Sequence, residues 1–204
     1  MSKPRTKSEL KRNQILDAAT LRFTQHGYAA TSMEHIAKLA GVSKQTVYSH
    51  FGNKDELFIT SITYKCELSG IAELLPENLG PVESTLTLFA QRFFTMITSP
   101  DSMAVHRICA SECLAHPHLS RLFFEAGPVF VTDKLAACLA EYHRRGELDI
   151  EDCRQAAIQL LAIIKGEQWI RLEFNIGESL SEEEIKHYLQ SSVRLFIRGY
   201  QTLS

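Results

Sequence analysis

The sequence has little of what several common protein classes require. Its 204 residues include only 10 glycines and 6 prolines, with no glycine-rich phosphate loop and little strand-like alternation. No run of about 18 apolar residues occurs, so we expect no membrane-spanning helix. The signatures HExxH and GxSxG, the Walker sequence and the dinucleotide fingerprint are also absent. We therefore expect neither an enzyme of these classes nor a bound cofactor.

The cysteines show no disulfide framework, because their number is odd and their spacing is irregular. The N-terminus is polar and unlike a signal peptide. Both features predict reduced thiols and a cytoplasmic protein. The cysteines are Cys66, Cys109, Cys113, Cys138 and Cys153.

Charge is distributed unevenly along the chain. Residues 1–60 hold nine basic and five acidic residues, an excess of four positive charges. The remainder holds thirteen basic and nineteen acidic residues, an excess of six negative charges. A basic end on an acidic body suits a protein that presents one end to a polyanion. Hydrophobic residues make up 45% of the chain, which is ample for a buried core.

The stretch TSMEHIAKLAGVSKQTVYSHF, residues 31–51, predicts two short helices joined by a tight turn. Thr31 and Glu34 have the spacing of a capping box, so Thr31 is the expected start of the first helix. Gly41 is expected to end that helix, and Ser43 to cap the second.

The second of these helices has an unusual outer face. At 100° per residue, Val47 and Phe51 fall together on the side expected to be buried. The opposite side carries Gln45 and Ser49, with Thr46 and Tyr48 on its flanks, and almost no acid. Amides and hydroxyls can reach base edges in DNA, and Lys, Tyr and His can reach phosphates.

Residues 15–57 resemble the helix-turn-helix domain of the TetR family of bacterial transcriptional regulators. The matching pieces are GY at 27–28, the stretch 31–51, and GNKDELF at 52–58. The resemblance implies base contacts from Lys44, Gln45 and Thr46, where the Gln45 amide could pair bidentately with adenine. The expected phosphate contacts are from Thr31, Tyr48, Ser49, His50 and Lys54.

A basic arm precedes the first expected helix and contains Lys3, Arg5, Lys7, Lys11 and Arg12. It is either a solvated tail or a segment that contacts phosphates or enters the minor groove. The two interpretations stay open at this point.

The rest of the sequence also has the residue spacing of helices, so the expected fold class is all-α. We expect a helix-turn-helix DNA-binding domain over 1–54, joined by a fourth helix to a larger ligand-binding and dimerisation domain over 55–204. The helices expected outside the stretch 31–51 are 8–26, 54–75, 81–98, 102–115, 118–145 with an interruption at Gly127-Pro128, 150–176 and 181–200.

The stretch RICASECLAHPHLSRLFFEAGP, residues 107–128, and the GELD turn at 146–149 are similar to the AefR-like group of C-terminal TetR domains. This resemblance implies a homodimer through the last two helices and a cavity for a small ligand. It does not identify the ligand.

An aromatic and methionine-rich set supports a cavity indirectly, although core packing is the usual role of such residues. Arg107 is a candidate polar anchor, with a solvated helix face as the alternative. The expected ligand-binding residues are Phe89, Phe93, Phe94, Met103, Arg107, Phe123, Phe124 and Trp169.

The residues His106, Cys109, Cys113 and His116 would share one face of a continuous helix. They could bind a metal ion or sense oxidants, but four ligands along one straight helix cannot surround one ion. We therefore expect no metal site.

The function predicted from these patterns is a DNA-binding repressor that a small, largely apolar or aromatic ligand releases from a pseudo-palindromic operator. Its expected partners are operator DNA, the effector and a second copy of the chain. A metal- or redox-responsive regulator is the first alternative. A helical enzyme or interaction protein is more remote, because it leaves the acid-free helix face unexplained.

Overall fold

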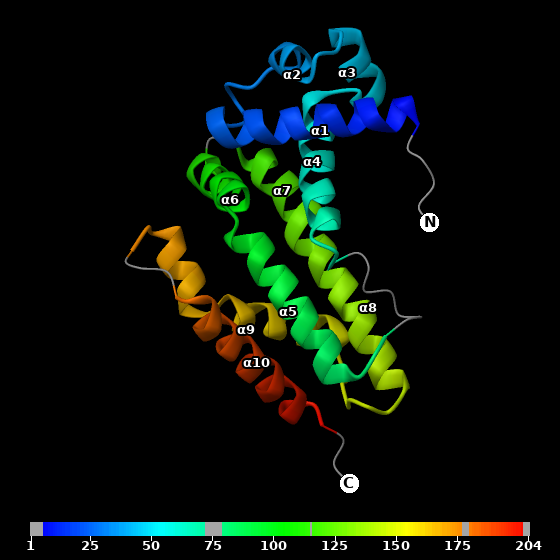
Figure 1. Ribbon diagram of the computed structural model, residues 1–204, viewed down its shortest axis with the longest axis vertical. Coiled ribbons are helices and arrows are strands. Elements are labelled where there is room, and N and C mark those ends of the chain that lie inside the picture. Colours follow the sequence, from blue (N-terminus) through cyan, green and yellow to red (C-terminus); the bar gives the residue numbers. More distant parts are fainter. Residues whose placement is uncertain (1–5, 72–78, 115, 177–179, 202–204) are drawn as a thin grey trace. The chain divides into compact units, whose positions relative to one another are not determined.

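The computed structural model describes residues 6–71, 79–114, 116–176 and 180–201 (Figure 1). This part of the chain is helical and contains no strand, which confirms the all-α prediction. None of its helices combines the length and the apolar composition needed to cross a membrane. The helices are α1 (Lys7–His26), α2 (Met33–Ala40), α3 (Lys44–Phe51), α4 (Lys54–Leu68), α5 (Val82–Thr98), α6 (Pro100–Glu112), α7 (Pro117–Phe124), α8 (Phe130–Arg144), α9 (Cys153–Glu173) and α10 (Glu182–Gly199), with a π-helical turn at Glu125–Val129.

The chain forms two compact units. The first contains residues 1–65 and 100–127, and the second contains residues 66–99 and 128–204. The chain therefore passes between the units three times: inside α4, at the junction of α5 and α6, and inside the π-helical turn. The boundary expected after residue 54 divides the chain by function rather than by packing, and it stays a prediction.

The first unit is built around the inward faces of its short helices. Ile15 and Phe23 of α1 are buried in one apolar cluster with Val47 of α3 and Leu57 of α4. Cys109 of α6 belongs to the same cluster, and α1 also packs directly against α6. The helix-turn-helix segment and α6 thus share one core.

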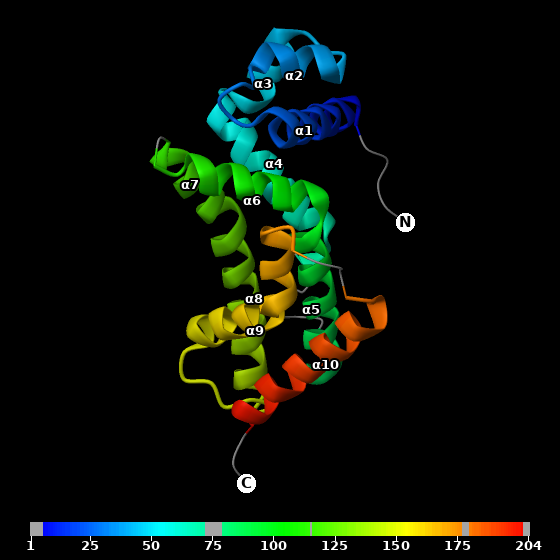
Figure 2. The ribbon, with the colours of Figure 1, turned by 90° about the vertical axis from the view of Figure 1, so that its left-hand side faces the viewer.

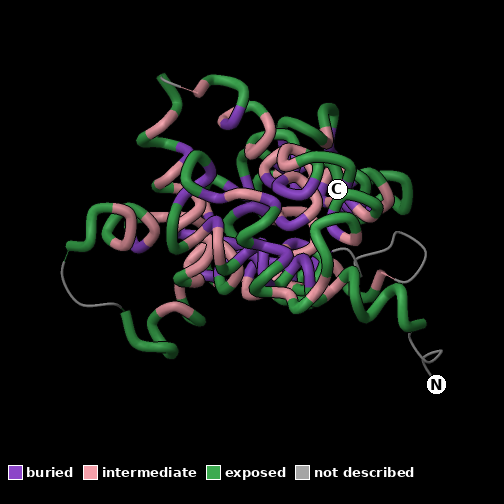
Figure 3. Tube along the Cα trace, turned by 90° about the horizontal axis from the view of Figure 1, so that it is seen from above, coloured by how far each residue is buried: buried purple, intermediate pink, exposed green. Residues whose placement is uncertain are grey.

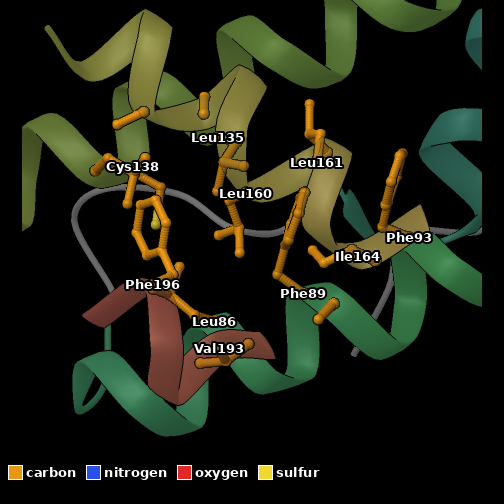
Figure 4. Packing of buried hydrophobic residues seen from close by; sticks show 14 of the residues in the cluster. Leu86, Phe89, Phe93, Leu135, Cys138, Leu160, Leu161, Ile164, Val193 and Phe196 are labelled. Atoms are coloured by element: carbon orange, nitrogen blue, oxygen red, sulfur yellow. The ribbon is translucent and has the colours of Figure 1, made fainter. Parts of the chain in front are cut away.

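The second unit packs α5, α8, α9 and α10 around a separate apolar cluster (Figure 4). Phe89 of α5, Leu135 of α8, Leu160 of α9 and Phe196 of α10 lie together in it. Tyr142 is fully buried beside them, and its hydroxyl donates a 2.8 Å hydrogen bond to the carbonyl of Gly80. Its polar atom is therefore satisfied inside the unit.

Burial follows the helical period in both units. Figure 3 shows exposed residues along the outer sides of the helices and buried residues along their inner sides. This pattern is the physical basis of the sequence-based helix assignment, because an apolar residue every three or four positions places one stripe inward.

Two helices end earlier than the sequence suggests. We expected α4 to reach about residue 75, but it ends at Leu68, before Gly70 with φ 74°. The carbonyl of Gly70 accepts a 2.8 Å hydrogen bond from the Arg92 guanidinium. We also expected α6 to continue to 115, and it ends at Glu112. The loop predicted at 76–78 lies outside the described residues.

The interruption predicted at Gly127-Pro128 is present as the π-helical turn between α7 and α8. Pro128 has no N–H to donate, so the regular helical ladder cannot continue through it. Local widening of the helix accommodates the proline, a common origin of such turns.

A break inside α9 was not predicted. Gly166 has φ 51° and ψ −163°, a conformation that essentially only glycine adopts. Figure 2 shows that the segment after this residue runs in a different direction from the segment before it. A Cβ atom at Gly166 would lie within 3.0 Å of the Tyr188 side chain, so the position is restricted by space as well as by backbone.

The Gly166→Ala substitution should destabilise the protein by about 1–3 kcal/mol, because alanine would carry backbone strain and meet Tyr188. Gly199→Ala is the matched control, since nothing lies within 4 Å of a Cβ there and its backbone is helical. That control should be neutral or stabilising by up to about 1 kcal/mol. Chemical denaturation of both variants measures the difference. Equal stabilities for the two variants would contradict the assigned conformation of Gly166.

Candidate nucleic-acid interface

The turn between α2 and α3 is fixed by short-range interactions. Gly41 adopts the left-handed conformation (φ 66°, ψ 31°), and its N–H donates to the end of α2, as expected for a helix C-cap. The Ser43 side chain accepts a hydrogen bond from the Thr46 N–H and caps α3. Both predictions for the turn are confirmed. The orientation of α3 relative to α2 follows from this turn.

The start of α2 was predicted one residue too early. Ser32 is the N-cap, and its side chain accepts a 3.2 Å hydrogen bond from the His35 N–H. Thr31 is instead turned into the core and is 2% exposed. The capping-box spacing to Glu34 favours Thr31, but both residues bear a hydroxyl, and the packing of Thr31 into the core leaves Ser32 as the cap.

The outer face of α3 is exposed as the helical projection predicted. Val47 and Phe51 are buried beneath the helix, whereas Lys44, Gln45 and Ser49 are exposed. Tyr48 is 44% exposed. The helix contains no acidic residue along its length. It therefore offers a cationic, amide and hydroxyl surface to a polyanion.

Several of these side chains have local partners. The Lys44 ammonium lies 3.5 Å from the Glu34 carboxylate, in a pair that is exposed on both sides. Thr46 is half-buried, and its hydroxyl lies 2.8 Å from the Ser43 hydroxyl. The Ser49 hydroxyl donates to the carbonyl of Thr46. The exposed Lys44–Glu34 ion pair is weak, so breaking it costs little.

Two of the residues expected to contact phosphate have partners within the first unit. The Thr31 hydroxyl lies 2.7 Å from the carbonyl oxygen of Gly27 and 3.2 Å from that of Arg22. The Lys54 ammonium donates to the carbonyls of Tyr28 and Thr31 at 3.0 and 3.1 Å. Both side chains thus hold the loop between α1 and α2.

Lys54 also lies over the ring of Tyr28, with 4.0 Å between the ammonium nitrogen and the ring centroid. Burial lowers the pKa of the Lys54 ammonium, and the negative charge of Glu112 on α6 opposes that shift. The Tyr28 hydroxyl donates to the carboxylate of Asp55 at the start of α4. Sequence reasoning missed this group, because its members meet only in the folded chain.

The basic arm is partly described. Lys7, Lys11 and Arg12 are exposed on α1, and Lys3 and Arg5 lie outside the described residues. The Arg12 guanidinium lies 5.5 Å from the centroid of the Phe51 ring at the end of α3. A cation–π contact of this kind places one basic side chain of α1 beside the candidate reading helix.

The expected ligand-binding residues are distributed over both units. Phe89, Phe93 and Phe94 are buried in the core of the second unit. Trp169 belongs to the same unit and is half-buried. In the first unit, Met103 is buried and Phe123 is half-buried. Arg107 and Phe124 belong to that unit too and are exposed. Their shared role as a pocket lining stays a prediction.

The described residues do not bring together a metal site. No three His, Cys, Asp or Glu side chains among them are placed to hold an ion. Cys109 is buried, whereas Cys113 follows the end of α6 and is exposed, so the expected continuous face is not formed. Burial raises the pKa of the Cys109 thiol to about 12, with a further contribution from Glu112. Such a thiol is a poor redox sensor, because the thiolate is the reactive form.

Known families match both parts of the chain. A family model described as bacterial regulatory proteins of the tetR family matches residues 15–60. Another, described as the C-terminal domain of AefR-like transcriptional repressors, matches residues 84–202, more than half of the chain. The chain belongs to the TetR family. TetR regulators bind operator DNA and function as dimers, so the chain is a DNA-binding regulator and not an enzyme.

Individual relatives agree with this assignment. The HTH-type transcriptional regulator TtgR of Pseudomonas putida is 27% identical over 178 residues, which cover 82% of this chain and 85% of TtgR. A solved structure of a TetR-family regulator from Mesorhizobium loti has a TM-score of 0.77 at 28% identity, covering 97% of this chain and 100% of that one. The flavonoid-responsive regulator FrrA has a TM-score of 0.72 at 31% identity, covering 96% of this chain and 100% of FrrA.

The Thr31→Val substitution tests the structural role assigned to the Thr31 hydroxyl. Valine keeps the shape but leaves the carbonyls of Gly27 and Arg22 without this donor, so we expect a loss of about 1–3 kcal/mol in unfolding free energy. Thr24→Val is the control, because the Thr24 hydroxyl donates only to Leu21 within its own helix. The control should change stability by less than about 0.5 kcal/mol. If the Thr31→Val protein were as stable as the parent, the structural role assigned to the Thr31 hydroxyl would be wrong.

Proposed function

We propose that this TetR regulator is a repressor that occupies a pseudo-palindromic operator as a homodimer and leaves it when a small, largely apolar or aromatic compound binds the C-terminal domain. The observation that carries the DNA-binding part is the outer face of α3, which is exposed, polar and free of acid. Because its target is chromosomal DNA, we place the protein in the cytoplasm.

Base discrimination is assigned to the first turn and a half of α3. Gln45 is exposed and can pair bidentately with adenine. Lys44 is also exposed, and its weak pair with Glu34 leaves its charge available to DNA. Thr46 is the third candidate, although its hydroxyl already meets the capping residue Ser43.

Phosphate contacts are assigned to Tyr48, Ser49 and His50, which follow along the same helix. Exposed Lys7 and Lys11 of α1 add positive charge that does not depend on sequence. Thr31 and Lys54 are assigned to support of the loop at 27–32, in agreement with their hydrogen bonds to it. Direct phosphate contact by these two residues stays a prediction.

The Gln45→Ala substitution should change which operator sequences are preferred, at about 1–3 kcal/mol for each lost base contact. Tyr48→Phe, which removes only a hydroxyl, should weaken binding similarly for all sequences. Glu83→Gln at an exposed position of α5 is the control and should leave binding unchanged. Selection from a random duplex pool, followed by titration at several salt concentrations, measures all three variants. An unchanged selected motif for Gln45→Ala would remove Gln45 from base reading.

The dimer surface is assigned to α9 and α10, because both helices expose apolar side chains. Ile158 and Ile170 of α9 are 48% and 52% exposed, and Leu195 of α10 is 63% exposed. Burial of such side chains against a second copy would remove apolar area from water. Ile163 of α9 is half-buried within its own chain, so a substitution there could also disturb the core of one subunit. A substitution at the more exposed Leu195 tests the dimer surface more directly.

The Leu195→Asp substitution should convert the dimer to monomers, because it would place an unpaired charge in an apolar interface. Leu21→Asp is the matched control: Leu21 is 43% exposed on α1, outside the proposed surface. The control should stay dimeric. Sedimentation velocity without DNA, over a range of protein concentrations, distinguishes the two. A dimeric Leu195→Asp protein would move the interface elsewhere.

Ligand release requires a coupling between the effector and the operator, and such coupling is reciprocal. From the sequence, α4 alone is expected to join the two domains. The three crossings of the chain between its compact units support a broader path that includes the junction of α5 and α6 and the π-helical turn. A coupling of about 1–3 kcal/mol would weaken operator affinity by roughly 5–150-fold.

The helix α6 is well placed to take part in this path. It packs against α1 in the first unit, and its first turn is tied to α4 by an ion pair of 2.9 Å between Lys65 and Asp101. A displacement of α6 would therefore act on the helices that support α3.

The aromatic effector class is supported by the aromatic content of α5 and by the similarity to FrrA, which is described as flavonoid-responsive.

A further inference from the structure

The break in α9 is held by contacts inside the second unit. The Tyr188 hydroxyl of α10 donates a 2.5 Å hydrogen bond to the carbonyl of Ile163, one turn before the break. The same side chain fills the space beside Gly166, where any larger residue would overlap it. The change of direction in α9 is thus stabilised by specific contacts, and it determines where the residues on either side of it lie.

A buried amide lies just after the break. Gln168 is 5% exposed, and within the described part of the chain its Oε1 atom has no hydrogen-bond partner. Buried polar groups in folded proteins nearly always have a partner, so an unsatisfied one requires an explanation. A bound ligand that completes the hydrogen bond is one such explanation.

A half-buried ammonium lies just before the break. Lys165 has no carboxylate within ion-pair distance among the described residues, and its nitrogen lies 4.9 Å from the centroid of the Trp169 ring. Burial lowers the pKa of this ammonium. Trp169 follows Gln168 directly in the chain, so the lysine contacts the neighbour of the unsatisfied amide.

The two polar groups restrict the chemistry of a ligand. A hydroxyl both donates and accepts, so it can satisfy either terminal atom of the Gln168 amide. An ammonium without a carboxylate favours a hydroxyl that can carry negative charge. A phenol has both properties, with a pKa of about 10, and its ring adds apolar area beside Trp169. A carboxylate would satisfy the lysine but has no proton to donate to the amide oxygen.

We propose that Lys165 and Gln168 form the polar end of the effector site and select phenolic compounds over apolar compounds that lack a free hydroxyl. The inference rests on the proposed function in one respect, namely that the effector binds in the C-terminal domain. It goes further by naming the chemical class and the two residues that recognise it.

The first test compares three probes that share one ring system. 2-Naphthol, its methyl ether and 2-naphthoate are titrated into the full-length protein without DNA, and binding is measured by calorimetry. We expect 2-naphthol to bind at least about tenfold more tightly than the methyl ether, because the loss of one hydrogen bond in a site without water lowers affinity by roughly that factor. Equal affinities for the two, no binding of 2-naphthol, or tightest binding of 2-naphthoate would overturn the proposal.

The second test uses variants that distinguish recognition from a structural role. Lys165→Met and Gln168→Leu should each lose the preference for 2-naphthol, while the ligand-free proteins melt at the same or a higher temperature, because an unsatisfied polar group has been removed. Lys186→Met and Gln155→Leu are exposed controls and should retain the preference. A lowered melting temperature together with an intact preference would assign the two residues to structure alone.

Operator binding is measured separately, with a labelled duplex and each probe. Binding of 2-naphthol that depends on Lys165 but leaves operator affinity unchanged would support the site and contradict the proposed switch. Release from the operator that is equally strong with 2-naphthol and its methyl ether, and unaffected by Lys165→Met, would support the switch and overturn the site. The two proposals can therefore fail independently.

Discussion

The presentation of α3 depends on the burial of its inner side. Val47 and Phe51 lie in the same apolar cluster as α1 and α4, and this contact turns the polar side outward. Residues of α2 and α6 contribute to the same cluster, so the reading helix has no independent support. Any change that loosens the cluster would disorder all the side chains assigned to DNA together, because their geometry has one common origin.

Local features of the fold were predictable from the sequence. The left-handed Gly41, the capping Ser43 and the outward side of α3 follow from rules that act over a few residues, and the structure agrees with each. The interruption at Pro128 was predictable for the same reason, since a missing N–H is a property of the residue itself.

Features that depend on tertiary contacts were not predictable. The capping-box spacing favours Thr31 as the cap of α2, and only the folded core selects Ser32. Lys54 is expected from the sequence to contact phosphate, and its hydrogen bonds to two carbonyls on a loop more than twenty residues away depend on the fold. Gly166 lies in a stretch with helical spacing, and its break depends on a tyrosine of another helix. A ligand pocket is not predictable for a related reason, because its lining depends on the placement of many segments that are distant in the sequence.

The pairing of Gly166 with Tyr188 has a consequence for how this protein can change during evolution. A side chain at position 166 is disfavoured by the backbone conformation and also by the Tyr188 side chain, and loss of that tyrosine would leave the carbonyl of Ile163 without its donor. Substitution of either residue alone should therefore lower the stability of the protein. Homologues with the same break in this helix should keep glycine at position 166 and a hydroxyl donor at position 188, whereas homologues with a continuous helix should be free of the constraint. Glycine at position 166 together with tyrosine at position 188 would thus identify which members of the family share this geometry without a structure of each.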